Sequence, residues 1–183
     1  MIRPVLITPP ETTPVSLADL KQEAAAGFTD DDALLQGYLG AAIAHLDGYA
    51  GILGRCLISQ TWAQPFRCWR DRMRLPFPDV ASVVVTYFDD EAAEQTVSDD
   101  LYEVTEGPRG AEVVFKDAFI RPSLDDDRDA PVKMTFVAGY GAAEDVPQDI
   151  KICILALARH WYDRNPGDPP QMRMIEKHRF RLV

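Results

Sequence analysis

The spacing of apolar residues changes twice along this 183-residue chain, and these changes limit the folds that it can adopt. Between residues 30 and 50, Leu35, Leu39, Ala42, Leu46 and Tyr49 recur at the spacing of one helical face. From residue 57 to residue 137, two-residue alternation and short apolar runs indicate β-strands. Helical spacing then returns. This order predicts an α+β fold and disfavours the βαβ units of a dinucleotide-binding sheet.

The first two predicted helices cover residues 16–26 and 30–50, and both begin with capping chemistry. Ser16 and Asp19 form a Ser-x-x-Asp pattern, in which each side chain can bond the backbone near the other. The Thr29 hydroxyl can cap the second helix. Asp30, Asp31 and Asp32 follow it, where the helix dipole favours negative charge.

The third predicted helix covers residues 148–164. Pro147 stands at its start and Asp149 in its first turn, which suits both the missing N–H of proline and the helix dipole. Asn165, Pro166 and Gly167 end it. The buried stripe is predicted to consist of Ile150, Ile154, Leu157 and Trp161.

Between these helices we predict six strands, joined by turn-forming sequences rich in Asp, Ser, Gly and Pro. The stretch from Ser123 to Pro131, with Asp125, Asp126, Asp127 and Asp129, is the least regular part of the block. The predicted strands are Leu57–Trp62, Met73–Leu75, Val80–Phe88, Leu101–Thr105, Glu112–Phe115 and Val132–Val137.

We therefore expect a single domain over residues 16–165, flanked by two segments without a core of their own. Four prolines among the first fifteen residues predict an extended arm over residues 1–15. A Pro-rich elbow and a basic tail follow over residues 166–183. In this α+β fold the N-terminal helices and a long C-terminal helix pack together. A central antiparallel β insertion, spanning residues 57–137, separates them, and the C-terminal tail is extended.

Charge is distributed unevenly and disfavours tight binding to nucleic acid. The formal net charge is −10, with −4 in residues 1–60, −10 in residues 61–150 and +4 in residues 151–183. Neutralising phosphates requires a basic face, and most of this chain is acidic. A basic tail suits an acidic partner. No run of residues is long and apolar enough for a membrane span, and we expect a soluble domain of cytosolic type.

The sequence predicts no catalytic, cofactor-binding or metal-binding residues. Cys153 and His160 lie about 10 Å apart along one helix, too far to share one ion directly. The three cysteines form no Cys-x-x-Cys pair, and reduced thiols are expected. The Asp125–Asp129 stretch lacks the glycine and distal glutamate of an EF-hand. No Gly-x-Ser-x-Gly turn or complete phosphate-binding loop is present.

One segment, Phe66–Arg74, combines aromatic and basic residues. Arginines that alternate with Trp69 and Phe66 could stack on single-stranded nucleic acid. In so acidic a block, a hairpin whose arginines face water, neighbouring acids or a protein interface is favoured.

Three stretches read together resemble the head–tail connector (adaptor) family of long-tailed bacteriophages and related prophage or gene-transfer particles. The resemblance runs from about residue 14 to the C-terminus, and it rests on the order and spacing of the stretches. They are Ser16–Lys21 with Asp31–Leu35, then Leu53–Trp62, and finally Phe136–Gly141 running into Val146–Lys151 and a helix that ends at His160-Trp161-Tyr162.

This resemblance implies a structural virion protein without enzymatic activity or cofactor. Family members form a ring, typically a dodecamer, beneath the portal protein. The ring extends the DNA channel and provides a platform for a stopper or tail-completion protein. DNA passes through without specific binding, and no membrane is involved. The resemblance implies a location at the head–tail interface of the virion, after synthesis and assembly in the bacterial cytoplasm.

Two sets of contact residues follow if the resemblance holds. The basic tail is expected to dock on the portal, becoming ordered when it binds. Its contact residues are Arg173, Met174, Ile175, Lys177, Arg179, Phe180 and Arg181. Neighbouring subunits are expected to meet through the arginine segment of one copy and the Asp-rich loop of the next. The residues involved are Arg67, Trp69, Arg70, Arg72, Arg74, Asp125, Asp126 and Asp127.

Three alternatives remain open. A head-completion stopper or tail-completion protein of the same particle is the nearest, although such proteins are often largely β. A small hydrolase or metal-binding enzyme would need a cluster of ligands or catalytic groups that the sequence does not show. A nucleic-acid-binding module would show DNA binding that weakens steeply with salt.

Overall fold

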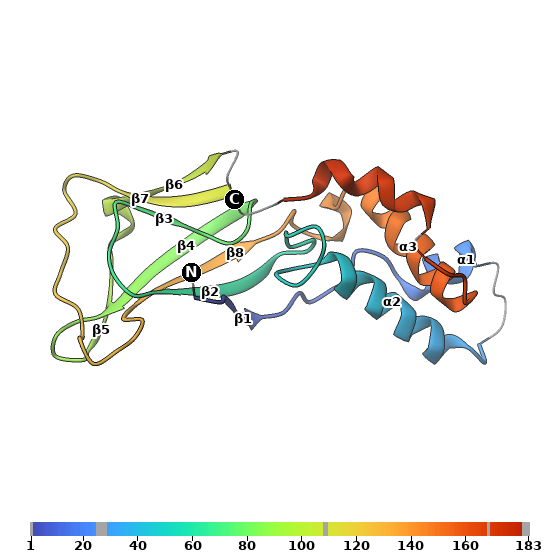
Figure 1. The fold of residues 1–183 in the computed structure, drawn as a ribbon, viewed down its shortest axis with the longest axis horizontal. Coiled ribbons are helices and arrows are strands. Elements are labelled where there is room, and N and C mark those ends of the chain that lie inside the picture. The colour runs from blue at the N-terminus through green and yellow to red at the C-terminus, as the bar shows by residue number, and fades with distance from the viewer. Residues whose placement is uncertain (1, 25–28, 108–109, 168, 181–183) are drawn as a thin grey trace. The chain divides into compact units, whose positions relative to one another are not determined.

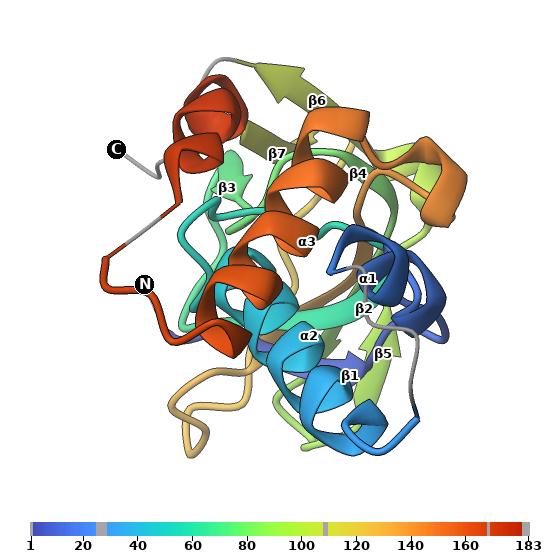
Figure 2. The same ribbon diagram turned by 90° about the vertical axis from the view of Figure 1, so that its right-hand side faces the viewer.

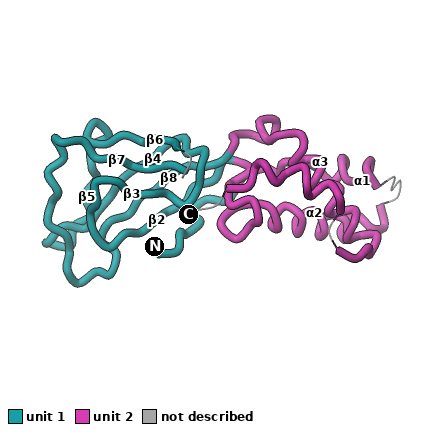
Figure 3. Tube along the Cα trace, turned by 45° about the horizontal axis from the view of Figure 1, so that its top comes forward, with its two compact units in different colours: residues 1–9, 59–139, 182–183 teal, residues 10–58, 140–181 magenta. Residues whose placement is uncertain are grey.

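A computed structural model describes residues 2–24, 29–107, 110–167 and 169–180. The chain divides into two compact units, where the sequence indicated a single domain over residues 16–165. Residues 1–9, 59–139 and 182–183 form one, here called the β unit. Residues 10–58 and 140–181 form the other, the helical unit (Figure 3). The chain divides because the strand block closes a core of its own.

The β unit contains two antiparallel sheets. The larger has the order β1-β2-β8-β4-β5, and the smaller β3-β7-β6 (Figure 1). The strands of the larger sheet are β1 Val5–Thr8, β2 Gln60–Phe66, β8 Val132–Ala138, β4 Val80–Phe88 and β5 Glu94–Thr96. Those of the smaller sheet are β3 Arg72–Arg74, β7 Gly110–Phe115 and β6 Tyr102–Gly107.

Alternation along the strands determines which face of the larger sheet is buried. In β8, Met134 and Phe136 are fully buried, whereas the alternate residues Lys133, Thr135 and Val137 are only partly covered. Phe77 packs beside Phe136 and against Trp62, with ring centroids 6.2 and 5.0 Å away. The Tyr102 hydroxyl donates to the Val83 carbonyl at 2.8 Å and links the two sheets. Burial raises the pKa of Tyr102.

Three helices build the core of the helical unit. They are α1 Leu17–Glu23, α2 Asp32–Leu46 and α3 Gln148–Tyr162 (Figure 2). The predicted capping box of Ser16 and Asp19 is present at the start of α1. Hydrogen bonds from Ser16 lower the pKa of the Asp19 carboxyl. Leu35, Leu39, Ala42 and Leu46 of α2 face Ile150, Ile154 and Leu157 of α3, and all seven are buried. These helices confirm the α+β class.

Several local expectations differ from the structure. Helix α2 ends at Leu46, because the chain turns at Gly48 with φ of 72°, so Tyr49 is 47% exposed instead of buried. Trp161 is only partly buried, with its ring 5.9 Å from that of His45. Strands β1 and β5 were not predicted as strands. Both are short edge strands that carry no burial pattern, since every residue in them is exposed.

The C-terminal segment is not an extended tail. Residues Pro170–His178 form a 3₁₀ helix, η3, which contacts α3; Figure 2 shows η3 in red beside the orange α3. Ile175 is buried in the helical core, and Met172 packs against that core. The sequence suggested a solvated arm because basic residues dominate this segment. Its two apolar anchors, Met172 and Ile175, stand among them. Among the described residues, no helix is long and apolar enough to cross a membrane.

The two leucines of α2 at positions 34 and 39 provide a direct test of the core. Leu39→Ala should lower the free energy of unfolding by about 2–5 kcal/mol, because it leaves a cavity between α2 and α3. Leu34→Ala is the matched control, since Leu34 is 50% exposed on the same helix, and it should change stability by less than about 0.5 kcal/mol. Urea unfolding of both variants measures this difference. Equal effects would remove Leu39 from the core.

Candidate interaction surfaces

The C-terminal segment is anchored to the first turn of α3 by a partly buried carboxylate. Asp149 Oδ2 lies 2.9 Å from Lys177 Nζ and 2.9 Å from His178 Nε2. Burial acts to raise the pKa of Asp149, but the hydrogen bonds and charges of Lys177 and His178 outweigh it. The pKa of Asp149 is therefore lowered from 3.8 to about 2. Asp149 stays ionised at neutral pH and holds both side chains of η3.

A second group of contacts secures the same segment from the opposite side of His178. Nδ1 of His178 lies 3.4 Å from the Tyr140 hydroxyl, which accepts a hydrogen bond of 2.6 Å from Arg55. The backbone N–H of Phe180 donates to the Leu53 carbonyl at 2.7 Å. Gly54 is required there, because its φ is +64° and a Cβ would lie 2.4 Å from the Phe180 oxygen.

This anchoring divides the predicted portal-docking residues into two groups. Arg173, Met174 and Lys177 of η3 are exposed, as is Arg179 directly after it, and these residues are here called the outer face of η3. Lys177 is at the same time bonded to Asp149. Ile175 is 2% exposed and belongs to the core, so its inclusion as a docking residue was wrong. Phe180 is partly covered. Arg181 lies outside the described residues.

The arginine segment of the β unit borders a cavity of about 640 Å³. Glu112 of β7 neutralises part of its charge: Arg74 Nε lies 2.7 Å from Glu112, and Arg72 lies 3.5 Å from it. The hydrogen bond from Arg74 lowers the pKa of Glu112. Arg70 is exposed. The lining also includes Ile2, Pro65, Phe66, Arg67, Cys68 and Met73, so an apolar floor is bordered by positive charge.

Trp69, which the sequence placed at an interface, supports the loop that follows β7. Its ring contacts those of Tyr87, Phe115 and Phe119, with centroid distances of 5.1–5.5 Å. Its Nε1 donates to the Pro122 carbonyl at 3.2 Å. Trp69 thus holds residues 119–122 in place, and most of its ring surface is used within the chain.

The structure brings part of the arginine segment and part of the Asp-rich loop together within one chain. Arg67 and Asp129 form an exposed ion pair at 3.1 Å. Asp125 accepts hydrogen bonds from Arg128 and from the N–H of Asp127, at 3.0 Å each. Asp125 is therefore a turn residue, whereas Asp126 and Asp127 are exposed.

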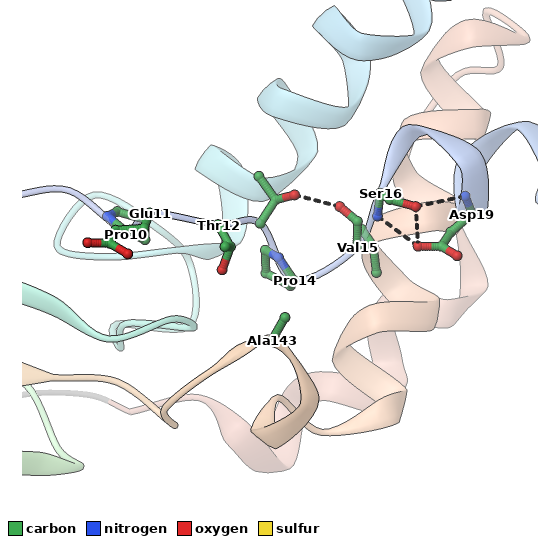
Figure 4. Close-up of a pocket in the computed structure, with 9 residues that line it drawn as sticks. Pro10, Glu11, Thr12, Pro14, Val15, Ser16, Asp19 and Ala143 are labelled. Atoms are coloured by element: carbon green, nitrogen blue, oxygen red, sulfur yellow. Dashed lines mark hydrogen bonds between the residues drawn. The ribbon is translucent and has the colours of Figure 1, made fainter.

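A depression of about 600 Å³ lies at the entrance to α1 (Figure 4). Residues 10–16, Asp19 and Ala143 line it. Asp19 is committed to the capping box with Ser16, and the Thr13 hydroxyl donates to the Val15 carbonyl at 2.7 Å. Its ionisable side chains are the carboxylates of Glu11 and Asp19.

Within the described part of the chain, no group of three or more His, Cys, Asp and Glu side chains is arranged to hold a metal ion. Cys153 is buried, with its Sγ 3.2 Å from the sulfur of Met172. His160 lies 3.2 Å from the Pro166 carbonyl at the end of α3. Each therefore has a structural neighbour. Cys68 is exposed beside the arginine-bordered cavity.

The chain is similar over its whole length to chains in three solved structures. "Neck of empty GTA particle computed with C6 symmetry" has 25% identity and a TM-score of 0.79. The chain in "Virion of native gene transfer agent (GTA) particle" has 23% identity and a TM-score of 0.78. The chain in "Neck of native GTA particle computed with C12 symmetry" has 24% identity and a TM-score of 0.78. Each match covers 100% of this chain and 97% of the other. No protein-family model and no curated protein matches the chain.

These similarities confirm the resemblance that the order of the sequence motifs indicated. The fold is similar to that of a chain in the neck of a gene-transfer-agent particle, and the similarity includes both units of this chain. The network of Arg55, Tyr140, Asp149 and His178 was not anticipated. Its members lie far apart in the sequence, and no local pattern joins them.

Asp149 is expected to control the docking of the C-terminal segment. Asp149→Asn should release η3 and speed tryptic cleavage after Lys177 and Arg179, whereas Glu176→Gln, a change at an exposed acid of η3, should not. Because the folded-state pKa is lowered, the stabilisation is complete above pH 3.8 and is lost as the pH falls towards 2. The difference in Tm between wild type and Asp149→Asn should therefore shrink over that range. Unchanged cleavage would contradict the anchoring role.

Proposed function

We propose that this chain is a head–tail connector, a structural protein that forms a ring under the portal of a phage-like or gene-transfer particle. One observation carries the proposal: the full-length similarity to a chain in a particle neck, solved with C12 symmetry. A dodecameric ring would extend the DNA channel and carry the next stopper or tail-completion protein. The chain would have no enzymatic activity, and its location would be the neck of the virion.

The outer face of η3 is proposed as the portal-docking surface. It presents Arg173, Met174 and Arg179 from a segment that is already folded on α3. The segment therefore acts as a pre-formed surface, and docking requires no ordering of a solvated arm. A folded surface loses less conformational entropy on binding than a disordered one. Positive charge beside one exposed methionine suits an acidic partner surface with a small apolar patch.

Contacts between subunits are proposed to use the arginine segment of one copy and the Asp-rich loop of the next. Arg70 and Arg72 are exposed, as are Asp126 and Asp127. Arg67, Arg74 and Asp125 already have partners within the chain and contribute less, and Arg72 has a longer contact of 3.5 Å with Glu112. Two different patches on one subunit make a heterologous contact, which closes into a ring when the rotation between copies allows it.

The acidic surface is proposed to let DNA pass without being held. With a net charge of −10, the chain offers few groups that could neutralise phosphates and release counterions. Some of the basic residues belong to the two proposed protein contacts. A salt-dependent DNA affinity would contradict this part of the proposal.

Mass photometry with the portal protein of the same particle tests the docking surface. Wild-type protein should add about a dozen copies to each portal ring. Arg173→Glu should weaken this binding at least about tenfold, which corresponds to about 1.4 kcal/mol. Lys116→Glu, the same charge change in the β unit, should bind like wild type. Equal binding of all three proteins would exclude η3 as the docking surface, and no binding of wild type would exclude the connector role.

A further inference from the structure

The outer face of the five-stranded sheet is unusual for so acidic a chain, because its centre carries no charge. Strand register places Ala63, Thr135 and Val84 in one row across the sheet face, with Thr61, Val137 and Ser82 in the next row on the same face. The opposite face holds the buried Met134, Phe136 and Val85. Val84 is 49% exposed in the middle of β4. Side chains of Val, Thr and Ser thus form a flat, neutral surface.

Edge strand β1 extends this surface with apolar side chains. Val5 pairs with Ala63 and lies on the same outer face. Val5, Leu6 and Ile7 are 54%, 41% and 55% exposed, although they are consecutive residues of a strand. An exposed apolar edge is a site for association with another chain. Charged residues are absent between Arg3 and Glu11 in the sequence.

Charge enters this surface only at the end where β4 and β5 meet. Lys133 and Glu94 form an ion pair at 2.7 Å, so they neutralise each other. Arg128 lies over the ring of Phe88, 3.6 Å from its centroid, and joins the Asp-rich loop to the end of β4. The exposed Asp126 and Asp127 follow in this loop. The surface therefore has a neutral centre and an acidic border on one side.

We propose that this face, the neutral sheet face, binds the arginine-bordered cavity of a second copy of the chain. The proposal rests on the connector function, and it identifies the subunit contact of that ring. The two surfaces complement each other: Phe66 and Met73 are apolar, as are Val5 and Val84, while Arg70 and Arg72 match the acidic border. Two copies that each carry −10 repel unless the surfaces that meet are neutral or opposite in charge.

The two surfaces are centred on different parts of the β unit and adjoin at the end of β2. The neutral face belongs to β1, β2, β8 and β4. The cavity is lined by Ile2, by Pro65 and Phe66 at the end of β2, by the residues that follow β2, by β3 and by Glu112 of β7. Each copy can then use its neutral face towards one neighbour and its cavity towards the other. This arrangement is the heterologous, head-to-tail contact that a cyclic ring requires.

A native cysteine makes the contact directly testable. Cys68 is exposed and lines the cavity. Val84→Cys places a thiol at the centre of the neutral face, so a short bismaleimide should link Val84→Cys of one copy to Cys68 of the next and give a ladder of multimers. The reaction is run on protein assembled with the portal ring and on free protein at high concentration. Val84→Cys/Cys68→Ser should give no ladder.

Matched control variants on the other sheet separate this contact from non-specific association. Val104 of β6 is 39% exposed, so Val104→Cys should not crosslink. Val84→Glu should prevent multimer formation while keeping the wild-type Tm, and Val104→Glu should not. Assembly on the portal without any Val84→Cys ladder would overturn the inference and leave the connector function intact. Absence of assembly, alone and with the portal, would overturn both.

Discussion

Identical copies of a chain with a formal net charge of −10 repel one another, so the distribution of charge decides which surfaces can meet in an assembly. In the β unit several charges are paired. Glu112 pairs with Arg74 and, at 3.5 Å, with Arg72, and Glu94 pairs with Lys133. In the helical unit, the Asp149 carboxylate contacts both Lys177 and His178. The charged side chains that are exposed outside these pairs are the candidates for contact with a partner.

The sequence was sufficient to predict the elements whose side chains follow a clear burial period. Helices α2 and α3 show their stripes in Leu35, Leu39, Ile154 and Leu157, and β4 was predicted with its observed bounds. Edge strands could not be found in this way, because every residue of β1 and β5 is exposed. The division into two units was also missed, since the cores of both units consist of similar apolar residues.

The sequence indicated which charged residues could take part in interactions, but not which of them are paired or buried within the chain. Arginines and aspartates marked the proposed surfaces, but no sequence pattern indicated that Arg67 pairs with Asp129 or that Trp69 anchors the Pro122 loop. Ile175 was assigned to docking because it stands among basic residues, although its burial fixes η3 on α3. Long-range contacts such as Asp149 with His178 depend on the tertiary fold, and no spacing rule indicates them.

Cryo-electron microscopy of the neck of the particle that contains this chain tests the central claim most directly. The account predicts a closed ring of about a dozen copies beneath the portal, in which the neutral sheet face of one copy covers the Cys68 cavity of the next. A neck that lacks the chain, or that holds a single copy outside any ring, would contradict it.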